Sequence, residues 1–376
     1  MRRILFCAST ASHLLRFHLP YLRAFREAGW EVWAASGTGE SVPFANRSEA
    51  LPLVKRPLSP RNAQAVLAAR SLLARGRFDA VSVHTTLAAA AVRAAALTLR
   101  CRPKIFYTCH GYLFSESGSA PRRAAWLAPE KLLAPVTDVL MVMNAEDRAI
   151  AQRHHLSASG TVRLIPGMGV DLPRYAVSLP EEERLSVRRR FGLGGRDFVF
   201  VCAAEFSARK NHALLLRAFA RTARACPNAR LLLAGDGALR EDCVRLAEEL
   251  GVARRVVFAG ELSGMERIFP ACDAAVSASR GEGLPFGVME AMAARLPVAA
   301  SRVKGHADLI RSGESGLLFS PDSPREAARA MTLLCRSPEL RGRLSDAAAR
   351  SLGPYALSAV LPRILAVYRA HFPGEL

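Results

Sequence analysis

The sequence of 376 residues contains no apolar run of the roughly 20 residues that a membrane-spanning helix requires. Its eight cysteines form no Cys-x-x-Cys pair and have no histidines at zinc-site spacing, so we expect buried, reduced thiols. The apolar start of the chain stops at Ser9, and His13 and Arg16 follow. It is predicted to be a first strand and not a secretory signal, so we expect a cytoplasmic protein.

Lysine and acidic residues are both scarce. Only five of the 52 basic residues are lysine, and 33 Asp and Glu leave a net charge of +19. The excess is larger in residues 1–177, with 23 basic against 11 acidic residues, than in residues 178–376, with 29 against 22. No nucleic-acid-binding module accompanies this charge, so we predict no nucleic-acid partner. The first half is instead expected to attract a phosphorylated acceptor or anionic lipid headgroups.

Short apolar runs alternate with longer helical patterns, which indicates an α/β fold with parallel sheets. Strands are expected near residues 3–8, 31–35, 79–84, 104–109, 137–143 and 161–166, and again near 197–204, 229–234, 255–259, 273–277, 297–300 and 316–319. Helices in the first half are expected at 14–28, 61–76, 86–100, 121–134 and 145–154.

The alternation breaks around residues 167–183, where we place a linker. We therefore predict two doubly wound, Rossmann-like domains, 1–175 and 176–354, facing a central cleft lined by the carboxyl ends of both sheets. A last helix, within residues 355–376, follows Gly353-Pro354 and is expected to be able to pack back on the first domain.

Two groups of candidate residues follow predicted strands of the second half. Arg209 and Lys210 stand directly before a helix expected from Asn211, a pattern that suits a diphosphate because the cations and the helix N-terminus both attract an anion. A solvated basic turn is the alternative. Gly235 and Gly237 would let the backbone approach a ligand closely, although a tight turn that needs positive φ explains them equally well.

The run Glu282-Gly-Leu-Pro-Phe-Gly-Val-Met-Glu290 places one carboxylate in a loop and another inside the following helix. Pro285 is expected to hold the loop rigid, with the helix beginning near Phe286. Glu290 then lies about one turn into the helix, within reach of ribose hydroxyls, and Glu282 lies nearer a sugar. Surface charge is the alternative, but Glu290 belongs to an apolar run, where an unpaired carboxylate is costly.

These two glutamates, preceded by Gly-Asp-Gly and Arg-Lys, resemble the retaining glycosyltransferases of family 4, which have the two-domain GT-B fold. The likeness covers the second half almost end to end, including Val256-Val-Phe-Ala-Gly260 and Ser312-Gly-Glu-Ser-Gly-Leu-Leu318. The first half is similar to a narrower branch that assembles exopolysaccharide, capsule or O-antigen, through Ser12-His13, Phe17-His-Leu-Pro-Tyr21 and Tyr107-Thr-Cys-His110-Gly111.

The resemblance implies transfer of a sugar from a UDP- or GDP-type nucleoside diphosphate sugar to an acceptor hydroxyl, with retention and with no tightly bound cofactor. The acceptor is expected to be a lipid-linked or growing polysaccharide. By resemblance, the diphosphate is assigned to Arg209 and Lys210, the ribose to Glu290 and the donor sugar to Glu282. The remaining site residues are Gly235, Gly237, Gly283, Leu284 and Pro285 around the donor, and His110 near the reaction centre. The sequence has no Asp-x-Asp motif, so no metal is predicted on the diphosphate.

Two other functions stay open, and the sequence argues against a third. A sugar-nucleotide epimerase shares the architecture, and a non-catalytic protein could bind the same nucleotide sugar. A nicotinamide oxidoreductase would need Gly-x-Gly-x-x-Gly after its first strand, which Cys7-Ala-Ser-Thr-Ala-Ser12 lacks. Peripheral binding to the inner face of the plasma membrane is a further hypothesis, based on basic residues that border apolar ones: Arg61, Arg70, Arg75 and Arg77 around Val66, Leu67, Leu72 and Leu73, and Arg122-Arg123 before Trp126-Leu127.

Overall fold

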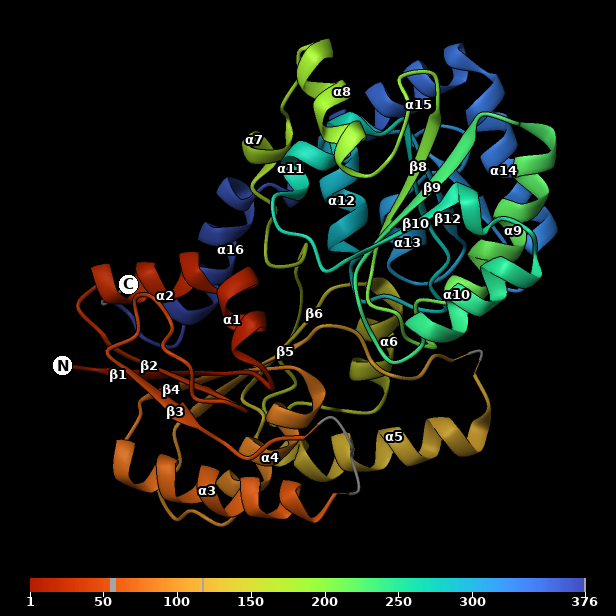
Figure 1. Cartoon of the computed structure of the whole chain (residues 1–376). Helices are drawn as coiled ribbons and strands as arrows, with labels where there is room; N and C mark the ends of the chain where they lie inside the picture. The colour runs from red at the N-terminus through yellow and green to blue at the C-terminus, as the bar shows by residue number, and fades with distance from the viewer. Residues whose placement is uncertain (55–58, 117, 375–376) are drawn as a thin grey trace. The chain divides into compact units, whose positions relative to one another are not determined.

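The computed structural model describes residues 1–54, 59–116 and 118–374 (Figure 1). The chain divides into two compact units. Unit 1 consists of Met1–Gly169 together with the chain from Ser358 onward, and unit 2 of Val170–Leu357. The last two residues of the predicted segment 355–376 lie outside the described part. No helix among the described residues is long and apolar enough to cross a membrane.

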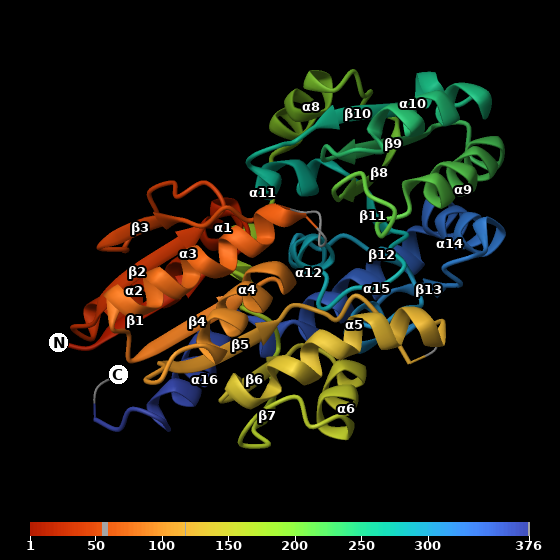
Figure 2. The same cartoon turned by 90° about the horizontal axis from the view of Figure 1, so that it is seen from below.

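Unit 1 contains a parallel sheet of seven strands in the order β3-β2-β1-β4-β5-β6-β7. Its strands are β1 Arg3–Cys7, β2 Glu31–Ser36, β3 Arg47–Ala50, β4 Ala80–His84, β5 Lys104–Cys109, β6 Val139–Val142 and β7 Val162–Leu164. Its helices are α1 Ala11–Phe17, α2 Leu19–Glu27, α3 Pro60–Gly76, α4 Thr86–Leu97, α5 Ala120–Leu133, α6 Ala145–Arg153 and α16 Leu357–Arg369. Helices α3, α4 and α5 cover one face of the sheet, which Figure 2 shows from below.

Two local predictions for unit 1 were wrong. The helix expected at 14–28 is two helices that meet at His18, because Pro20 has no N–H and its ring excludes the carbonyl four residues earlier. The edge strand β3 was not predicted. Its sequence Arg47-Ser-Glu-Ala50 is polar and largely exposed, so it lacks the apolar pattern of a buried strand.

Helix α16 packs within unit 1, on the face of the sheet opposite to α3. Tyr368 is 2% exposed, and its ring stacks on Phe106 of β5 with centroids 4.2 Å apart. The Tyr368 hydroxyl lies 2.6 Å from Ser82 Oγ in β4. A segment from the end of the chain therefore completes the core that the first 169 residues begin.

Unit 2 has a parallel sheet of six strands in the order β10-β9-β8-β11-β12-β13. Its strands are β8 Phe198–Ala203, β9 Ala229–Ala234, β10 Val256–Gly260, β11 Ala274–Ser277, β12 Val298–Ser301 and β13 Leu317–Phe319. Its helices are α7 Leu172–Tyr175, α8 Glu181–Arg190, α9 His212–Ala225, α10 Arg240–Glu249, α11 Met265–Ile268, α12 Phe286–Ala293, α13 His306–Leu309, α14 Pro324–Arg336 and α15 Pro338–Ser351. The short 3₁₀ helices η2 Ala253–Arg255, η3 Phe269–Ala271 and η4 Gly353–Tyr355 also belong to unit 2, while η1 Ala134–Val136 belongs to unit 1.

Both sheets have a topological switch point, where the strand order changes direction. It lies between β1 and β4 in unit 1 and between β8 and β11 in unit 2. At the amino end of the second pair, Asp273 Oδ2 accepts hydrogen bonds from Val199 N at 2.7 Å and from Arg188 Nη2 at 2.6 Å. Arg188 is 1% exposed and Asp273 is 21% exposed, so a partly buried ion pair links the two strands whose opposite ends carry the candidate site.

Candidate active site

The predicted charged residues of unit 2 come from the two loops that leave the switch point. Arg209 and Lys210 lie in the loop after β8, and Glu282 lies in the loop after β11. In open parallel sheets, ligands bind outside the carboxyl ends of the strands at this position. The topology thus brings together residues that are 72 and 73 positions apart in the sequence.

Glu282 is the centre of this cluster. One carboxylate oxygen lies 2.6 Å from Lys210 Nζ and the other 2.6 Å from Arg209 Nη1, while the Glu282 side chain is only 6% exposed. Burial alone would raise the pKa of Glu282, but the charges of Lys210 and Arg209 lower this pKa to about 2. The carboxylate is therefore ionised and holds both cations in fixed positions.

Backbone contacts set the shape of both loops. The Ser207 carbonyl accepts hydrogen bonds from the amides of Lys210 and Asn211, and Arg280 N donates to Arg209 O at 2.7 Å. Asn211 has φ of 55° and is the N-cap of α9, which begins at His212, one residue after the predicted start. These contacts keep Arg209 and Lys210 in the loop at the edge of the sheet, before α9 begins.

A third loop, which follows β12, packs behind Glu282. Glu282 N donates to Lys304 O at 3.3 Å. Gly305 has φ of 80°, and a Cβ there would meet Glu282 Cβ at 2.8 Å, so no larger residue fits. His306 is fully buried, and its Nδ1 lies 2.9 Å from Ser301 O. Burial lowers the pKa of His306 to about 4 although Glu282 opposes this shift.

Gly235 and Gly237 support the site through the backbone. Their φ angles are 148° and 150°, and added Cβ atoms would meet Ala204 O at 2.2 Å and Phe206 O at 2.6 Å. Phe206 N also donates to Asp236 O. The loop after β9 therefore packs directly on the loop that carries Arg209, which accounts for both glycines without any ligand.

The predicted loop and helix after Glu282 are present. Gly283, Leu284 and Pro285 are buried, and α12 begins at Phe286 as expected. A Cβ on Gly287 would lie 3.1 Å from Ala203 O, so the start of α12 abuts the end of β8. Glu290 is 5% exposed on this helix. Its carboxylate is buried near the switch point and is not a surface charge.

His110 belongs to unit 1, directly after β5, and three other histidines surround it. His13 lies in α1, His18 follows α1, and His84 ends β4. His110 Nε2 lies 3.4 Å from His13 Nε2 and 3.3 Å from His84 Nδ1. Burial lowers the pKa of His13 to about 4, and burial together with the neighbouring imidazoles lowers the pKa values of the other three. Of these four histidines, only His110 was predicted from the sequence to be a site residue.

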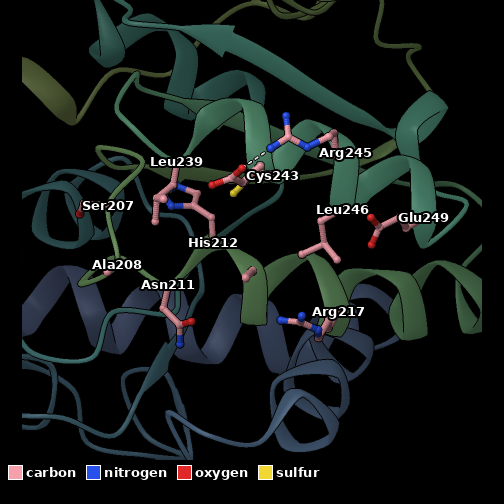
Figure 3. A pocket seen from close by; sticks show the side chains of 12 residues that line it. Ser207, Ala208, Asn211, His212, Arg217, Leu239, Cys243, Arg245, Leu246 and Glu249 are labelled. Atoms are coloured by element: carbon pink, nitrogen blue, oxygen red, sulfur yellow. Dashed lines mark hydrogen bonds and ion pairs between the residues drawn. The ribbon is translucent and has the colours of Figure 1, made fainter.

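A separate pocket of about 530 Å³ opens between α9 and α10 (Figure 3). His212 and Arg217 line it from α9, and Leu239, Cys243 and Leu246 line it from the side of α10. Ser207 and Ala208 connect it to the loop of Arg209 and Lys210. Arg209, Lys210, Glu282 and Glu290 are not among the residues that line it, so it is distinct from the charged cluster.

Two family models match the chain. The model "Glycosyl transferases group 1" matches residues 183–351, and the model "Glycosyltransferase Family 4" matches residues 21–174. EpsD of Bacillus subtilis strain 168, provisionally named as a glycosyltransferase, is 31% identical over 98% of this chain and 97% of its own length. An Escherichia coli enzyme, UDP-Gal:alpha-D-GlcNAc-diphosphoundecaprenol alpha-1,3-galactosyltransferase, is 23% identical over 69% of this chain and 67% of its own length.

The fold has solved counterparts. The crystal structure of HepE from Anabaena in complex with UDP and glucose matches 98% of this chain and 100% of its own with a TM-score of 0.76, at 19% identity. The two parallel Rossmann-like units, the two matched models and the full-length likeness to EpsD agree with one another. The chain therefore belongs to the family 4 glycosyltransferases and has their GT-B fold.

Proposed function

We propose that this glycosyltransferase uses a nucleoside diphosphate sugar of the UDP or GDP type and that unit 2 binds it. The observation that carries the proposal is the convergence of Arg209 and Lys210 on buried Glu282 at the switch point. The two cations are assigned to the diphosphate, Glu290 to the ribose and Glu282 to the sugar. Gly283, Leu284 and Pro285 add backbone groups, and Gly235 and Gly237 hold the loop in place.

In the proposed reaction, the bond from the anomeric carbon to the diphosphate breaks and the acceptor oxygen bonds to the same face of that carbon. The acceptor proton passes to the leaving phosphate. Fixed cations stabilise the charge that develops on the diphosphate, so the step needs no metal at this position and no enzymic nucleophile. His110 is assigned to the reaction centre. Nuclear magnetic resonance of the first product formed measures its anomeric configuration and so tests for retention.

Residues 1–175 are assigned to the acceptor, and a lipid-linked or growing polysaccharide is the proposed class. The undecaprenol-linked acceptor in the name of the E. coli relative supports this class, as does the excess of positive charge in the first half. The enzyme would then work in the cytoplasm at the inner face of the plasma membrane.

The central test is transfer by Arg209→Ala and Lys210→Ala. Each variant is expected to lose at least about 100-fold in turnover and to bind the nucleoside diphosphate more weakly, because a fixed cation is lost. Arg280→Ala is the matched control, since Arg280 lies in the neighbouring loop and pairs with exposed Asp322. Near-normal transfer by both variants would overturn the donor assignment. Isomerised donor in the absence of acceptor would favour an epimerase, and binding without transfer a non-catalytic protein.

Membrane association is tested separately. Leu72 and Leu73 are buried against the sheet, which leaves Leu67 on α3 and Leu132 on α5 as exposed apolar residues, 68% and 69% exposed. Arg61, Arg70, Arg75 and Arg77 are exposed on or next to α3. Flotation with anionic liposomes at low salt is expected, with weaker flotation of Leu67→Ser. No flotation of the wild type would remove the membrane hypothesis.

A further inference from the structure

The four histidines of unit 1 occupy its switch point. His13 and His18 come from the segment after β1, while His84 ends β4 and His110 follows β5. The rings of His18 and His84 have centroids 3.7 Å apart and are tilted by 33°, and those of His13 and His110 meet edge to face at 4.6 Å. This is the position at which doubly wound sheets bind ligands.

The cluster does not satisfy its own hydrogen-bonding groups. His18 is 0% exposed, and within the described residues neither of its ring nitrogens has a hydrogen-bond partner. A buried polar group left unpaired costs about 1–3 kcal/mol. The separations of 3.3 and 3.4 Å around His110 Nε2 are also longer than the usual N–H···N or N–H···O contact. His18 therefore has a ring nitrogen lone pair without a hydrogen bond, and its neighbours are the imidazoles of the other three histidines.

One pair of ring nitrogens has the separation found in a metal site. With Zn–N bonds of about 2.1 Å, two ligand atoms of a tetrahedral site lie about 3.4 Å apart, which is the separation of His13 Nε2 and His110 Nε2. One ring nitrogen from each of His13, His18 and His110 can be chosen so that all lie within 4.8 Å of one another, so the rings must move closer for all three to reach this spacing. Imidazole is a preferred ligand of zinc, and neighbouring groups usually hold the ligand rings in orientation.

Such neighbouring groups are present here. His84 Nε2 lies 2.9 Å from Ser82 Oγ, which in turn contacts the hydroxyl of Tyr368 at 2.6 Å. Phe6 stacks on the His84 ring, with centroids 6.2 Å apart and an angle of 11°. His84 is thereby fixed, and its ring supports His18 from one side.

We propose that His13, His18 and His110 bind one Zn²⁺ ion in unit 1, with a fourth position open to an oxygen ligand. Three protein ligands and one open position are typical of zinc sites that bind substrates or water. The proposed ligands of the ion belong to unit 1, whereas the proposed cations for the donor diphosphate belong to unit 2. The proposal does not depend on the donor assignment.

The test uses the full-length protein without a histidine tag. After treatment with a chelator, it is titrated with Co²⁺, and we expect one equivalent to bind with the visible absorption of a tetrahedral site and to be displaced by Zn²⁺. His18→Ala should weaken binding at least roughly tenfold, as should His13→Ala. His154→Ala, outside the cluster, is the control and should bind like the wild type.

Circular dichroism and gel filtration establish that the variants are folded, and His18→Asn provides a second variant of similar size. Substoichiometric cobalt, or unchanged affinity in folded His18→Ala and His18→Asn, would overturn the proposal. Binding of inorganic phosphate in place of metal would also overturn it. Loss of transfer by Arg209→Ala has no bearing on cobalt binding, so the failure of one proposal is distinguishable from the failure of the other.

Discussion

The two switch points of this molecule occupy equivalent places in two similar sheets, yet their chemistry is opposite. In unit 2, a buried carboxylate pairs with two cations, and every group is charged. In unit 1, four imidazoles are held neutral by burial and by one another. The charged cluster of unit 2 suits an anionic ligand that replaces Glu282 beside the two cations. The neutral imidazoles of unit 1 suit a metal ion, which accepts their electron pairs. The same topology therefore determines where a ligand binds but not which ligand binds.

The largest expected effect comes from breaking the support of the unit 2 site. Arg188→Ala leaves the Asp273 carboxylate, which is 21% exposed, without the buried guanidinium that contacts it at 2.6 Å. We expect a loss of about 3–5 kcal/mol in the stability of unit 2, because an ion pair is broken inside the protein. Hydrogen exchange in β8 and β11 measures this loss, and β4 and β5 of unit 1 should keep their protection.

Arg184→Ala is the matched variant, because Arg184 contacts the same carboxylate at 2.9 Å with a side chain that is 23% exposed. The loss of stability of unit 2 in this variant should be about 1 kcal/mol or less. Equal losses in the two variants would show that burial of the pair is not what stabilises the strands.

Glu282→Gln tests whether the carboxylate acts on the sugar or on the cations. The substitution leaves Arg209 and Lys210 in place and removes their internal anion, so nucleoside diphosphate should bind at least as tightly as to the wild type. Transfer is expected to fall about 100-fold because the proposed sugar contact is lost. Calorimetry and turnover measure the two effects. Asp322→Asn, an exposed partner of Arg280, should change neither. A parallel loss of diphosphate binding would contradict the separation of roles.

The smallest effect is expected on stability when the pH is lowered. The pKa of Glu282 is lowered from 4.5 to about 2 in the folded protein, so the unfolded chain takes up the proton first as the pH falls. The stability that this ion-paired carboxylate contributes is therefore complete above pH 4.5 and decreases as the pH falls toward 2. Urea unfolding at pH 6, 5 and 4 gives the free energy of unfolding of the wild type and of Glu282→Gln. The difference between these two free energies should become smaller only at pH 4. A difference that narrows already between pH 6 and 5 would assign the effect to another group.

The sequence allowed the fold class and most strands to be predicted because buried parallel strands are short apolar runs between helical patterns. The charged residues of unit 2 were identified because each follows directly on such a strand, and α12 begins where Pro285 allows it to. The ion pairs of Glu282 were not foreseen, since they depend on β8 and β11 being neighbours.

The histidine cluster could not be assembled from the sequence. Its members belong to three separate segments, and His13 and His18 are five residues apart across a helix break that the periodicity did not show. The close approach of Gly305 to Glu282 could not be predicted for a related reason, because it depends on two loops from different strands. Contacts between segments distant in sequence follow from topology, which single motifs do not encode.

The placement of α16 has a consequence for synthesis of the chain. Ser82, which contacts His84, gains its partner Tyr368 only when the last residues have been made. Domains generally fold as units while the chain emerges from the ribosome. Unit 2 is continuous in sequence and can complete its core before the end of the chain is made. Unit 1 is synthesised earlier, but its core stays incomplete until the C-terminal segment has been synthesised. A truncation before α16 would leave a folded second unit attached to a first unit that cannot close its core.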